Sequence, residues 1–259
     1  MKPLVTIILS VHNQQQYIAA AITSMLKQTY SPIELICIDD ASADQTPQIL
    51  KKFPKSKIQI ITNSHHLGLA ASLNVGLNQA KGKYIARMDA DDISHSNRIA
   101  TQVKILEQNQ QIAVCGTAAT LIDYTGKKIG LKQYPTNPHT VIMRYNPIIH
   151  PTVMIRASII KQLGRYDESL NGAEDYDLWL RIGSKYKMTN LSSALISYRL
   201  NPQGVSWKTL KHVERQAIKA RWKAITKYHY SAKHVIYLLK PILSYLIPSQ
   251  IKKYWFNII

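Results

Sequence analysis

Tyr84-Ile85-Ala86-Arg87-Met88-Asp89-Ala90-Asp91-Asp92 is an apolar run that ends in three carboxylates within four residues. So dense an acidic group needs a reason in a chain with 33 Lys and Arg against 15 Asp and Glu. Hard cations take oxygen ligands, and Mg²⁺ commonly uses one or two carboxylates together with the phosphates of a substrate. A solvated turn that caps the following helix would also explain the acids, because carboxylates stabilise a helix N-terminus. The surrounding sequence has to decide between these two interpretations.

Short apolar runs alternate with stretches of helical period through the first 90 residues. The predicted strands are residues 4–9, 33–38 and 58–61 and the segment that ends at Asp89. Helices are predicted between them, among them one at residues 69–80. This alternation is typical of βαβ units and predicts a parallel sheet covered by helices on both faces.

The polar segments that follow three of these strands are predicted to meet. In sheets of this kind ligands bind beyond the carboxyl ends of the strands. Those ends are residues 10–13, 39–42 and 89–92, which all carry acidic or hydrogen-bonding side chains. Three such loops on one rim of the sheet predict a nucleotide pocket with a metal ion.

A second acidic cluster, Glu174-Asp175, opens a later predicted helix. It follows a predicted helix at 96–109, an apolar stretch at 112–122 and a passage with several prolines. Capping would again explain the acids, and Trp179 on this helix is predicted to lie in the core. The surrounding sequence therefore also has to decide between helix capping and a functional role for this second cluster.

At 259 residues the chain is long enough for one large α/β domain, or for one domain with an appendage. Its two cysteines, Cys37 and Cys115, sit in apolar runs and are predicted to be buried, reduced thiols, which favours a reducing compartment. The N-terminus shows no signal-peptide pattern, and no apolar stretch reaches the roughly 18 to 20 residues of a membrane span. We therefore expect a cytoplasmic protein.

The net charge of +18 is concentrated near the C-terminus. From residue 201 onward eleven Lys and Arg stand against one acid, Glu214, so a polyanion, either nucleic acid or an anionic membrane surface, is the expected partner. Residues 207–228 predict an amphipathic helix whose basic residues lie outside the apolar stripe: Lys211, Arg215, Lys219, Lys223 and Lys227. Residues 235–247 add an apolar patch.

We interpret this C-terminal segment as a helical extension that lies on an anionic bilayer. The predicted boundary separates a domain of residues 1–205 from a basic amphipathic segment of residues 206–259. A packed C-terminal subdomain or a dimer interface is the alternative interpretation.

Five stretches, taken together and in order, resemble the family 2 glycosyltransferases of the GT-A fold. They are VTIILSVHN (5–13), ELICIDDASAD (34–44), LGLAASLN (67–74) with ARMDADD (86–92), HPTVM (150–154) and EDYDLW (174–179). The resemblance covers roughly residues 4 to 200. It implies an α/β GT-A fold, with a Rossmann-like mixed sheet flanked by helices.

The resemblance also implies roles for single residues. Ser10, His12 and Asn13 would belong to the nucleotide loop, with Asp40 accepting a hydrogen bond from the base. Asp89 would lie by the ribose or the metal, and Asp91 would be the principal metal ligand. Asp175 would be the catalytic base with Glu174 beside it, and His150 and Arg199 are candidates for contacts to the acceptor or the diphosphate.

One position departs from the family pattern. Many relatives have an arginine just before Asn74, where this chain has Leu73. A basic contact to the donor must therefore come from another residue or be absent. The candidates are Arg87, Arg98, Arg156 and Arg199.

The expected activity is an inverting transfer of a sugar from a nucleotide donor, with UDP as the expected nucleotide and Mn²⁺ or Mg²⁺ as cofactor. One carboxylate would hold the cation against the leaving diphosphate, while another takes the proton of the acceptor hydroxyl. Relatives imply a lipid-linked saccharide acceptor in envelope polysaccharide synthesis, at the inner face of a bacterial cell membrane.

The sequence leaves three other hypotheses. A polyprenyl-phosphate sugar synthase would need little help from a base, because its acceptor is a phosphate. A basic nucleic-acid-binding module would explain the C-terminal charge, but an acidic rim repels phosphates unless a cation intervenes. We therefore expect no nucleic-acid partner. A transferase-like scaffold without activity conflicts with the retained acids.

Overall fold

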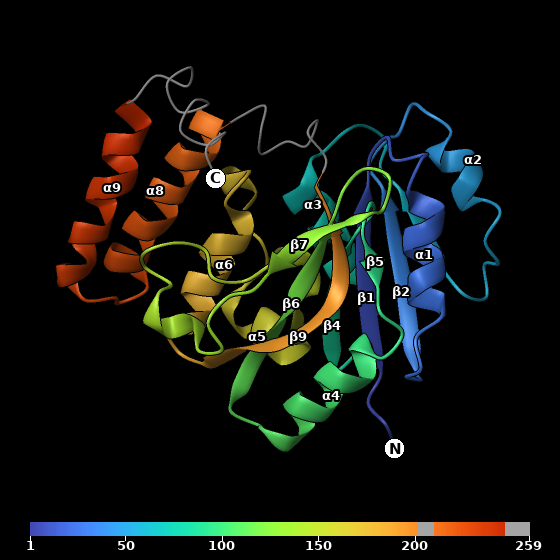
Figure 1. Ribbon diagram of the computed structural model, residues 1–259, viewed down its shortest axis with the longest axis horizontal. Helices are drawn as coiled ribbons and strands as arrows, with labels where there is room; N and C mark the ends of the chain where they lie inside the picture. The colour runs from blue at the N-terminus through green and yellow to red at the C-terminus, as the bar shows by residue number, and fades with distance from the viewer. Residues whose placement is uncertain (201–209, 247–259) are drawn as a thin grey trace.

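The structure of the chain is a computed structural model, and it describes residues 1–200 and 210–246 (Figure 1). The described residues form a nine-stranded sheet in the order β3-β2-β1-β4-β8-β6-β9-β5, and β7 pairs with β6 off this path. The strands are β1 Val5–Val11, β2 Ile33–Asp39, β3 Gln59–Thr62, β4 Tyr84–Asp89, β5 Ile93–Ser94, β6 Ile112–Ile122, β7 Lys128–Lys132, β8 Met154–Arg156 and β9 Lys187–Arg199.

Helices cover both faces of the sheet. The α-helices are α1 Ile18–Leu26, α2 Thr46–Leu50, α3 Leu69–Gln79, α4 Arg98–Gln108, α5 Ala157–Leu163, α6 Glu174–Gly183, α8 Leu210–Lys227 and α9 Ile236–Leu246. Short 3₁₀ helices occur at η1 Pro138–Thr140, η2 His150–Thr152, η3 Glu168–Leu170 and η4 Ala232–Val235. In Figure 1 α1 and α2 lie at one side of the sheet, and α8 and α9 lie at the other.

The parallel pairing predicted for the first 90 residues is confirmed for β1 to β4, and the strands beyond them make the sheet mixed. β1 pairs in parallel with β2 and β4, and β2 pairs in parallel with β3. β8 then pairs antiparallel with both β4 and β6, while β6 and β9 are parallel. The chain enters β8 from the proline-containing passage and not from a helical crossover, and only a crossover imposes the parallel direction. The whole is the mixed sheet that the family resemblance implied.

Alternating residues of the central strands separate two cores. Ile7 and Leu9 of β1 pack on the face covered by α1, α2 and α4, whereas Ile8 packs on the face covered by α3, α5 and α6. Helix α3 approaches the sheet closely at Gly76, where an added Cβ would lie 2.6 Å from Ile8 Cγ2. Cys37 and Cys115 are buried and free, as predicted.

Helix α8 shares a core with the sheet domain. Ala220 and Ala224 are fully buried in the same cluster as Leu178 and Trp179 of α6. The predicted domain boundary at 205/206 lies outside the described residues, and so do residues 207 and 247, the first residue of one predicted C-terminal segment and the last residue of the other. None of the helices within 1–200 and 210–246 combines the length and the apolar character that crossing a bilayer requires.

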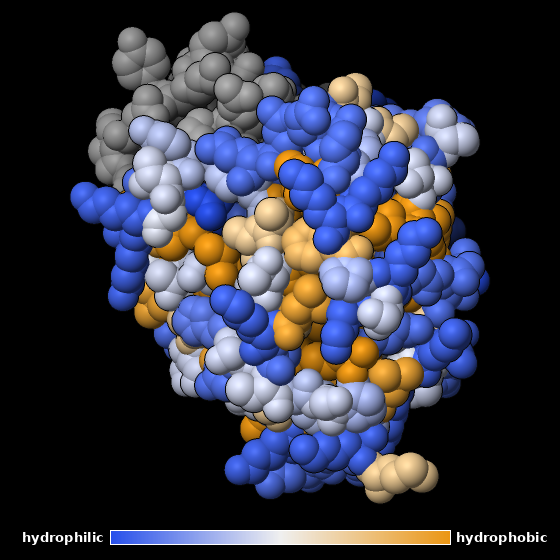
Figure 2. Space-filling model, turned by 90° about the vertical axis from the view of Figure 1, so that its right-hand side faces the viewer, coloured by the Kyte–Doolittle hydropathy of each residue, from blue (hydrophilic) through white to orange (hydrophobic). Residues whose placement is uncertain are grey.

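The surface on the side of α1 and α2 is mainly hydrophilic, with smaller apolar areas among the polar side chains (Figure 2). The larger group of exposed apolar side chains lies on α9 and the segment before it: Val235, Ile236, Leu239, Ile242 and Leu243.

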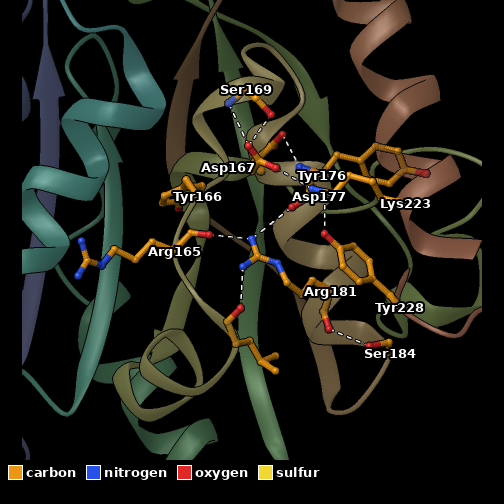
Figure 3. Close-up of polar contacts among 12 residues, drawn as sticks. Arg165, Tyr166, Asp167, Ser169, Tyr176, Asp177, Arg181, Ser184, Lys223 and Tyr228 are labelled. Atoms are coloured by element: carbon orange, nitrogen blue, oxygen red, sulfur yellow. Dashed lines mark hydrogen bonds and ion pairs between the residues drawn. The ribbon is translucent and has the colours of Figure 1, made fainter. Parts of the chain in front are cut away.

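A buried ion-pair network fixes α8 to α6 (Figure 3). Lys223 Nζ of α8 lies 2.8 Å from Asp177 Oδ1 of α6 and 2.7 Å from Asp167 Oδ2. Tyr228 donates to Asp177 Oδ1 at 2.8 Å, and Arg181 lies 3.2 Å from the other carboxylate oxygen. The predicted position of Lys223 is outside the apolar stripe of its helix, and the structure adds that two acids from distant segments hold its half-buried ammonium.

The network depends on Asp177, whose side chain has no exposed surface. Burial alone would lower the pKa of Lys223, but its hydrogen bonds to Asp167 and Asp177 outweigh burial and raise the pKa. The two helices are thus held by charge pairing as well as by apolar contact, and α6 begins with the acidic cluster Glu174-Asp175.

We expect Lys223→Met to lower the free energy of unfolding by about 3 kcal/mol, because it leaves the Asp177 carboxylate buried without its main cation. Urea denaturation measures this change. Lys219→Met, one turn earlier on the exposed side of α8, is the matched control and should stay within about 0.5 kcal/mol. Equal stability of the two variants would contradict a structural role for the network.

Candidate active site

The rim predicted from the strand ends is present. Ser10 at the end of β1 is in register with Ile38 of β2 and with Asp89 of β4, so the loops that follow these strands lie together. They border a pocket of about 640 Å³. This volume lies in the range of small-molecule sites. The far wall comes from β7, from residues 146–151 and from the start of α6.

Asp40 lies at one end of the pocket and is almost fully buried. Its carboxylate accepts hydrogen bonds from Asn63 Nδ2 and from the backbone N–H groups of Leu67 and Gly68. Burial alone would raise the pKa of Asp40, but these hydrogen bonds lower it. His66 Nδ1 is a fourth donor at 2.9 Å. The side chain of His66 is 58% exposed, and the predicted contact between Asp40 and a base stays a prediction.

Two imidazole rings stand beside Asp40. His12 and His66 line the pocket with their ring centroids 4.2 Å apart, and His12 Nδ1 lies 2.7 Å from the carbonyl oxygen of Asp40. Ser10 also lines the pocket. Asn13 does not belong to the lining residues, and it joins the two loops by accepting a hydrogen bond from the N–H of Ala43.

The three carboxylates that end β4 have different surroundings. Asp89 and Asp91 line the pocket, whereas Asp92 is buried and accepts a hydrogen bond from the N–H of Arg199 at 2.8 Å. Burial and the charge of Asp89 raise the pKa of Asp91 to about 6. Asp89 and Asp91 are thus both part of the pocket wall, and Asp92 fastens the loop to β9.

Glu174 and Asp175 face the same pocket from the start of α6. Asp175 Oδ2 accepts a hydrogen bond from Asn146 Nδ2 at 2.7 Å. Burial raises the pKa of Asp175, although the hydrogen bond from Asn146 opposes this effect. Burial and the charge of Asp175 raise the pKa of Glu174 to about 7. A carboxylate with a raised pKa in a pocket is suited to accept a proton.

The remaining pocket candidates are Arg87 and His150. Arg87 pairs with Asp89, and two of its nitrogens, Nε and Nη1, are buried without a hydrogen-bond partner. His150 Nε2 lies 2.9 Å from the Tyr166 hydroxyl group. Burial and the charge of Arg87 hold the pKa of His150 well below its ordinary value, so its ring is neutral.

Three candidate arginines bind backbone carbonyl groups. Arg98 donates to the carbonyl oxygens of Arg87 and Val153, and Arg156 donates to those of Ile112, Leu106 and Asn109. Arg199 donates to the carbonyl oxygens of Asp91, Asp123 and Tyr124. Its predicted contact with a diphosphate or an acceptor stays a prediction, as does that of His150.

Several lining residues were not singled out in the sequence. Those with polar groups include His66, Lys132, Tyr134, Asn146 and Tyr198. His66 directly precedes the motif stretch at 67–74 and could have been noticed by its position. The others come from β7, β9 and the proline-containing passage, where no periodicity or acidic cluster distinguishes them.

Comparison with known proteins gives one family. The sequence profile described as Glycosyl transferase family 2 matches residues 6–163. The Bacillus subtilis (strain 168) protein named "Putative glycosyltransferase EpsE" is 33% identical over 256 residues, which cover 96% of this chain and 91% of that protein. The Escherichia coli protein named "UDP-Glc:alpha-D-GlcNAc-diphosphoundecaprenol beta-1,3-glucosyltransferase WfaP" is 31% identical, with 90% and 94% covered.

Solved structures show the same fold. Staphylococcus aureus TarS 1-349, crystallised with UDP-GlcNAc, superposes with a TM-score of 0.73 at 18% identity, over 98% of this chain and 78% of that one. The Pyrobaculum calidifontis mannosyltransferase PcManGT, in complex with GDP-Man and Mn²⁺, gives a TM-score of 0.67 at 17% identity, over 94% and 75%.

Proposed function

Because this chain belongs to glycosyl transferase family 2, we propose that it extends a lipid-linked saccharide with a sugar from a nucleotide donor. The chain is a glycosyltransferase with the GT-A fold, and relatives act in polysaccharide synthesis, as the E. coli protein named "O-antigen biosynthesis glycosyltransferase WbnJ" does by its name. The proposed transfer inverts the anomeric carbon and depends on a divalent cation. UDP is the proposed nucleotide, since the WfaP name specifies UDP-Glc.

The observation that carries this proposal is the placement of two acidic pairs in one pocket. Asp89 and Asp91 come from the end of β4, whereas Glu174 and Asp175 come from the start of α6. Inverting transfer needs a cation at the leaving diphosphate and a base at the attacking hydroxyl group. Two separate carboxylate pairs provide for both.

Asp89 and Asp91 fit a hard cation. Both are carboxylates, both line the pocket, and burial together with the charge of Asp89 raises the pKa of Asp91. Two carboxylates and the oxygens of a diphosphate form a donor set that Mg²⁺ and Mn²⁺ prefer. When bound, the cation would offset the charge that develops on the departing nucleoside diphosphate.

Asp175 is the proposed base that takes the proton of the acceptor hydroxyl group. Asn146 holds one of its oxygens, so the carboxylate has a defined orientation toward the pocket. Glu174 accepts a hydrogen bond from the N–H of Gly172 and has a pKa of about 7, so near neutrality it carries a proton part of the time. A protonated Glu174 leaves Asp175 as the charged member of the pair.

At the other end of the pocket Ser10, His12 and Asp40 would bind the base of the nucleotide. Asp40 already orders the loop before α3 through Leu67 and Gly68. Helix α3 begins directly after this loop. Binding of the base would therefore exchange the His66 contact for a ligand contact without disturbing the loop.

We further propose that the C-terminal helices hold the enzyme on the inner face of the cell membrane. The exposed apolar residues of α9 and the segment before it recur at helical spacing: Val235, Ile236, Leu239, Ile242 and Leu243. Exposed lysines accompany them at 227 and 233. An apolar stripe with a basic border is typical of helices that lie in the headgroup region of anionic bilayers.

Asp91→Ala should abolish turnover that depends on Mn²⁺ or Mg²⁺, because it removes one of the two proposed protein ligands of the cation. Release of the nucleoside diphosphate, measured over a range of Mn²⁺ concentrations, checks this. Asp123→Ala, which removes a half-buried carboxylate in the turn after β6, is the control for an acid lost outside the pocket lining. Normal Mn²⁺-dependent turnover in Asp91→Ala would contradict the metal assignment.

Asp175→Asn should lower kcat by about 10²- to 10⁴-fold with a hydroxyl acceptor, while donor binding persists, because general-base help is lost. In the wild type the rate should fall as the pH falls through the raised pKa of Asp175, since protonation removes the base. Asn146→Ala should shift this decline to higher pH, because Asn146 lowers the pKa of Asp175. The pH profile of kcat/KM measures both effects. A mild effect of Asp175→Asn would instead favour a polyprenyl-phosphate acceptor.

The double variant Leu239→Glu/Leu243→Glu should bind vesicles rich in phosphatidylglycerol roughly tenfold or more weakly, because two apolar anchors become charged. Vesicle sedimentation measures the bound fraction. Leu26→Glu, at the end of α1 on the opposite side of the molecule in Figure 1, is the control. Unchanged sedimentation of the double variant would refute the membrane role of α9.

A further inference from the structure

Lys132 is the last residue of β7, and its side chain forms part of the pocket wall. The ammonium group lies over two aromatic rings, 5.4 Å from the centroid of Tyr198 and 5.7 Å from that of Tyr134. Tyr134 and Tyr198 line the pocket as well. A lysine and two tyrosines thus form one continuous patch of the wall, which we call the β7 patch.

The ammonium of Lys132 has no anionic partner among the described residues. None of the ion pairs in that part of the chain includes it. Of the neighbouring cations, Arg199 binds three carbonyl oxygens, and Arg87 pairs with Asp89 through one nitrogen while its Nε and Nη1 have no hydrogen-bond partner. Burial lowers the pKa of Lys132, although the charge of Asp175 opposes this effect. A half-buried ammonium without a contacting anion is suited to bind one from a ligand.

The position of the β7 patch separates it from the nucleotide end of the pocket. Ser10, His12 and Asp40 follow β1 and β2, whereas β7 is joined to the sheet through β6, on the other side of β4 (Figure 1). Asp175 and Asn146 lie on this side of the pocket, and the charge of Asp175 by itself raises the pKa of Lys132. The patch therefore borders the space where an acceptor would meet the proposed base.

We propose that the β7 patch binds an acceptor phosphate, with Lys132 pairing with a phosphate group attached to the sugar that is extended. This inference rests on the proposed function and names the chemistry by which the acceptor is recognised, a sugar diphosphate ester. The rings of Tyr134 and Tyr198 offer flat, partly apolar surfaces to the sugar next to that phosphate. The ammonium then distinguishes a phosphorylated acceptor from a neutral glycoside.

The same ammonium could instead contact the diphosphate of the donor, and the experiment has to separate these two sources of phosphate. The variant is Lys132→Gln, and the matched control is Lys128→Gln, which removes an exposed charge from the other end of β7. The probes are short alkyl esters of the 1-diphosphates of glucose, galactose, N-acetylglucosamine and N-acetylgalactosamine, each with the matching neutral alkyl glycoside. Calorimetric titration with UDP and Mn²⁺ present gives Kd without requiring turnover, and titration with UDP alone gives donor-side affinity.

The wild type and Lys128→Gln should bind at least one diphosphate ester more tightly than its glycoside. Lys132→Gln should lower the affinity for that ester by about 10- to 100-fold, the loss expected for one charged hydrogen bond. Its affinities for the glycoside and for UDP should stay within about twofold of the wild-type values. Weaker UDP binding would assign Lys132 to the donor. Unchanged ester binding, or a wild type without preference for any ester, would overturn the proposal. A separate measurement tests the proposed function itself. If the wild-type protein releases no nucleotide from any UDP sugar, the proposed function fails.

Discussion

A single buried guanidinium limits proton uptake by the acids of the pocket. Arg87 forms an ion pair with Asp89 and partly opposes the effect of burial, which raises the pKa of the other acids around the pocket: Asp91, Asp92, Glu174 and Asp175. Without this positive charge the pKa values of these carboxyl groups would be higher still, since a cluster of like charges in a buried site favours its neutral form. The proposed cation site and the proposed base therefore depend on the same residue of β4.

The pocket rim could be predicted because it follows from periodicity. Apolar runs of strand length with helices between them require parallel pairing, and parallel pairing brings successive strand ends to one edge. That is why Ser10, Asp40 and Asp89 converge as expected. The acids after β4 could not be told apart in the sequence, however. Asp91 faces the pocket and Asp92 faces a backbone N–H of β9, a difference set by a strand more than a hundred residues away.

Residues whose partners are distant in sequence escaped prediction for the same reason. The helical period places Lys223 outside the apolar stripe, but it gives no sign that Asp167 and Asp177 pair with this ammonium. Helical period tells which face of α8 is apolar, but it does not tell which charges stand opposite. Asn146 likewise lies in an irregular passage, where its contact with Asp175 has no local signal.

The two walls of the pocket come from differently distributed parts of the chain. The nucleotide side is assembled from loops scattered through the first 92 residues, so change in one loop disturbs the others that touch the same ligand. The opposite side comes largely from one uninterrupted piece of chain, residues 132–151. On the proposed assignment, enzymes of this kind can diverge toward new saccharide chains through substitutions in that short piece, while they continue to draw on the same activated sugar.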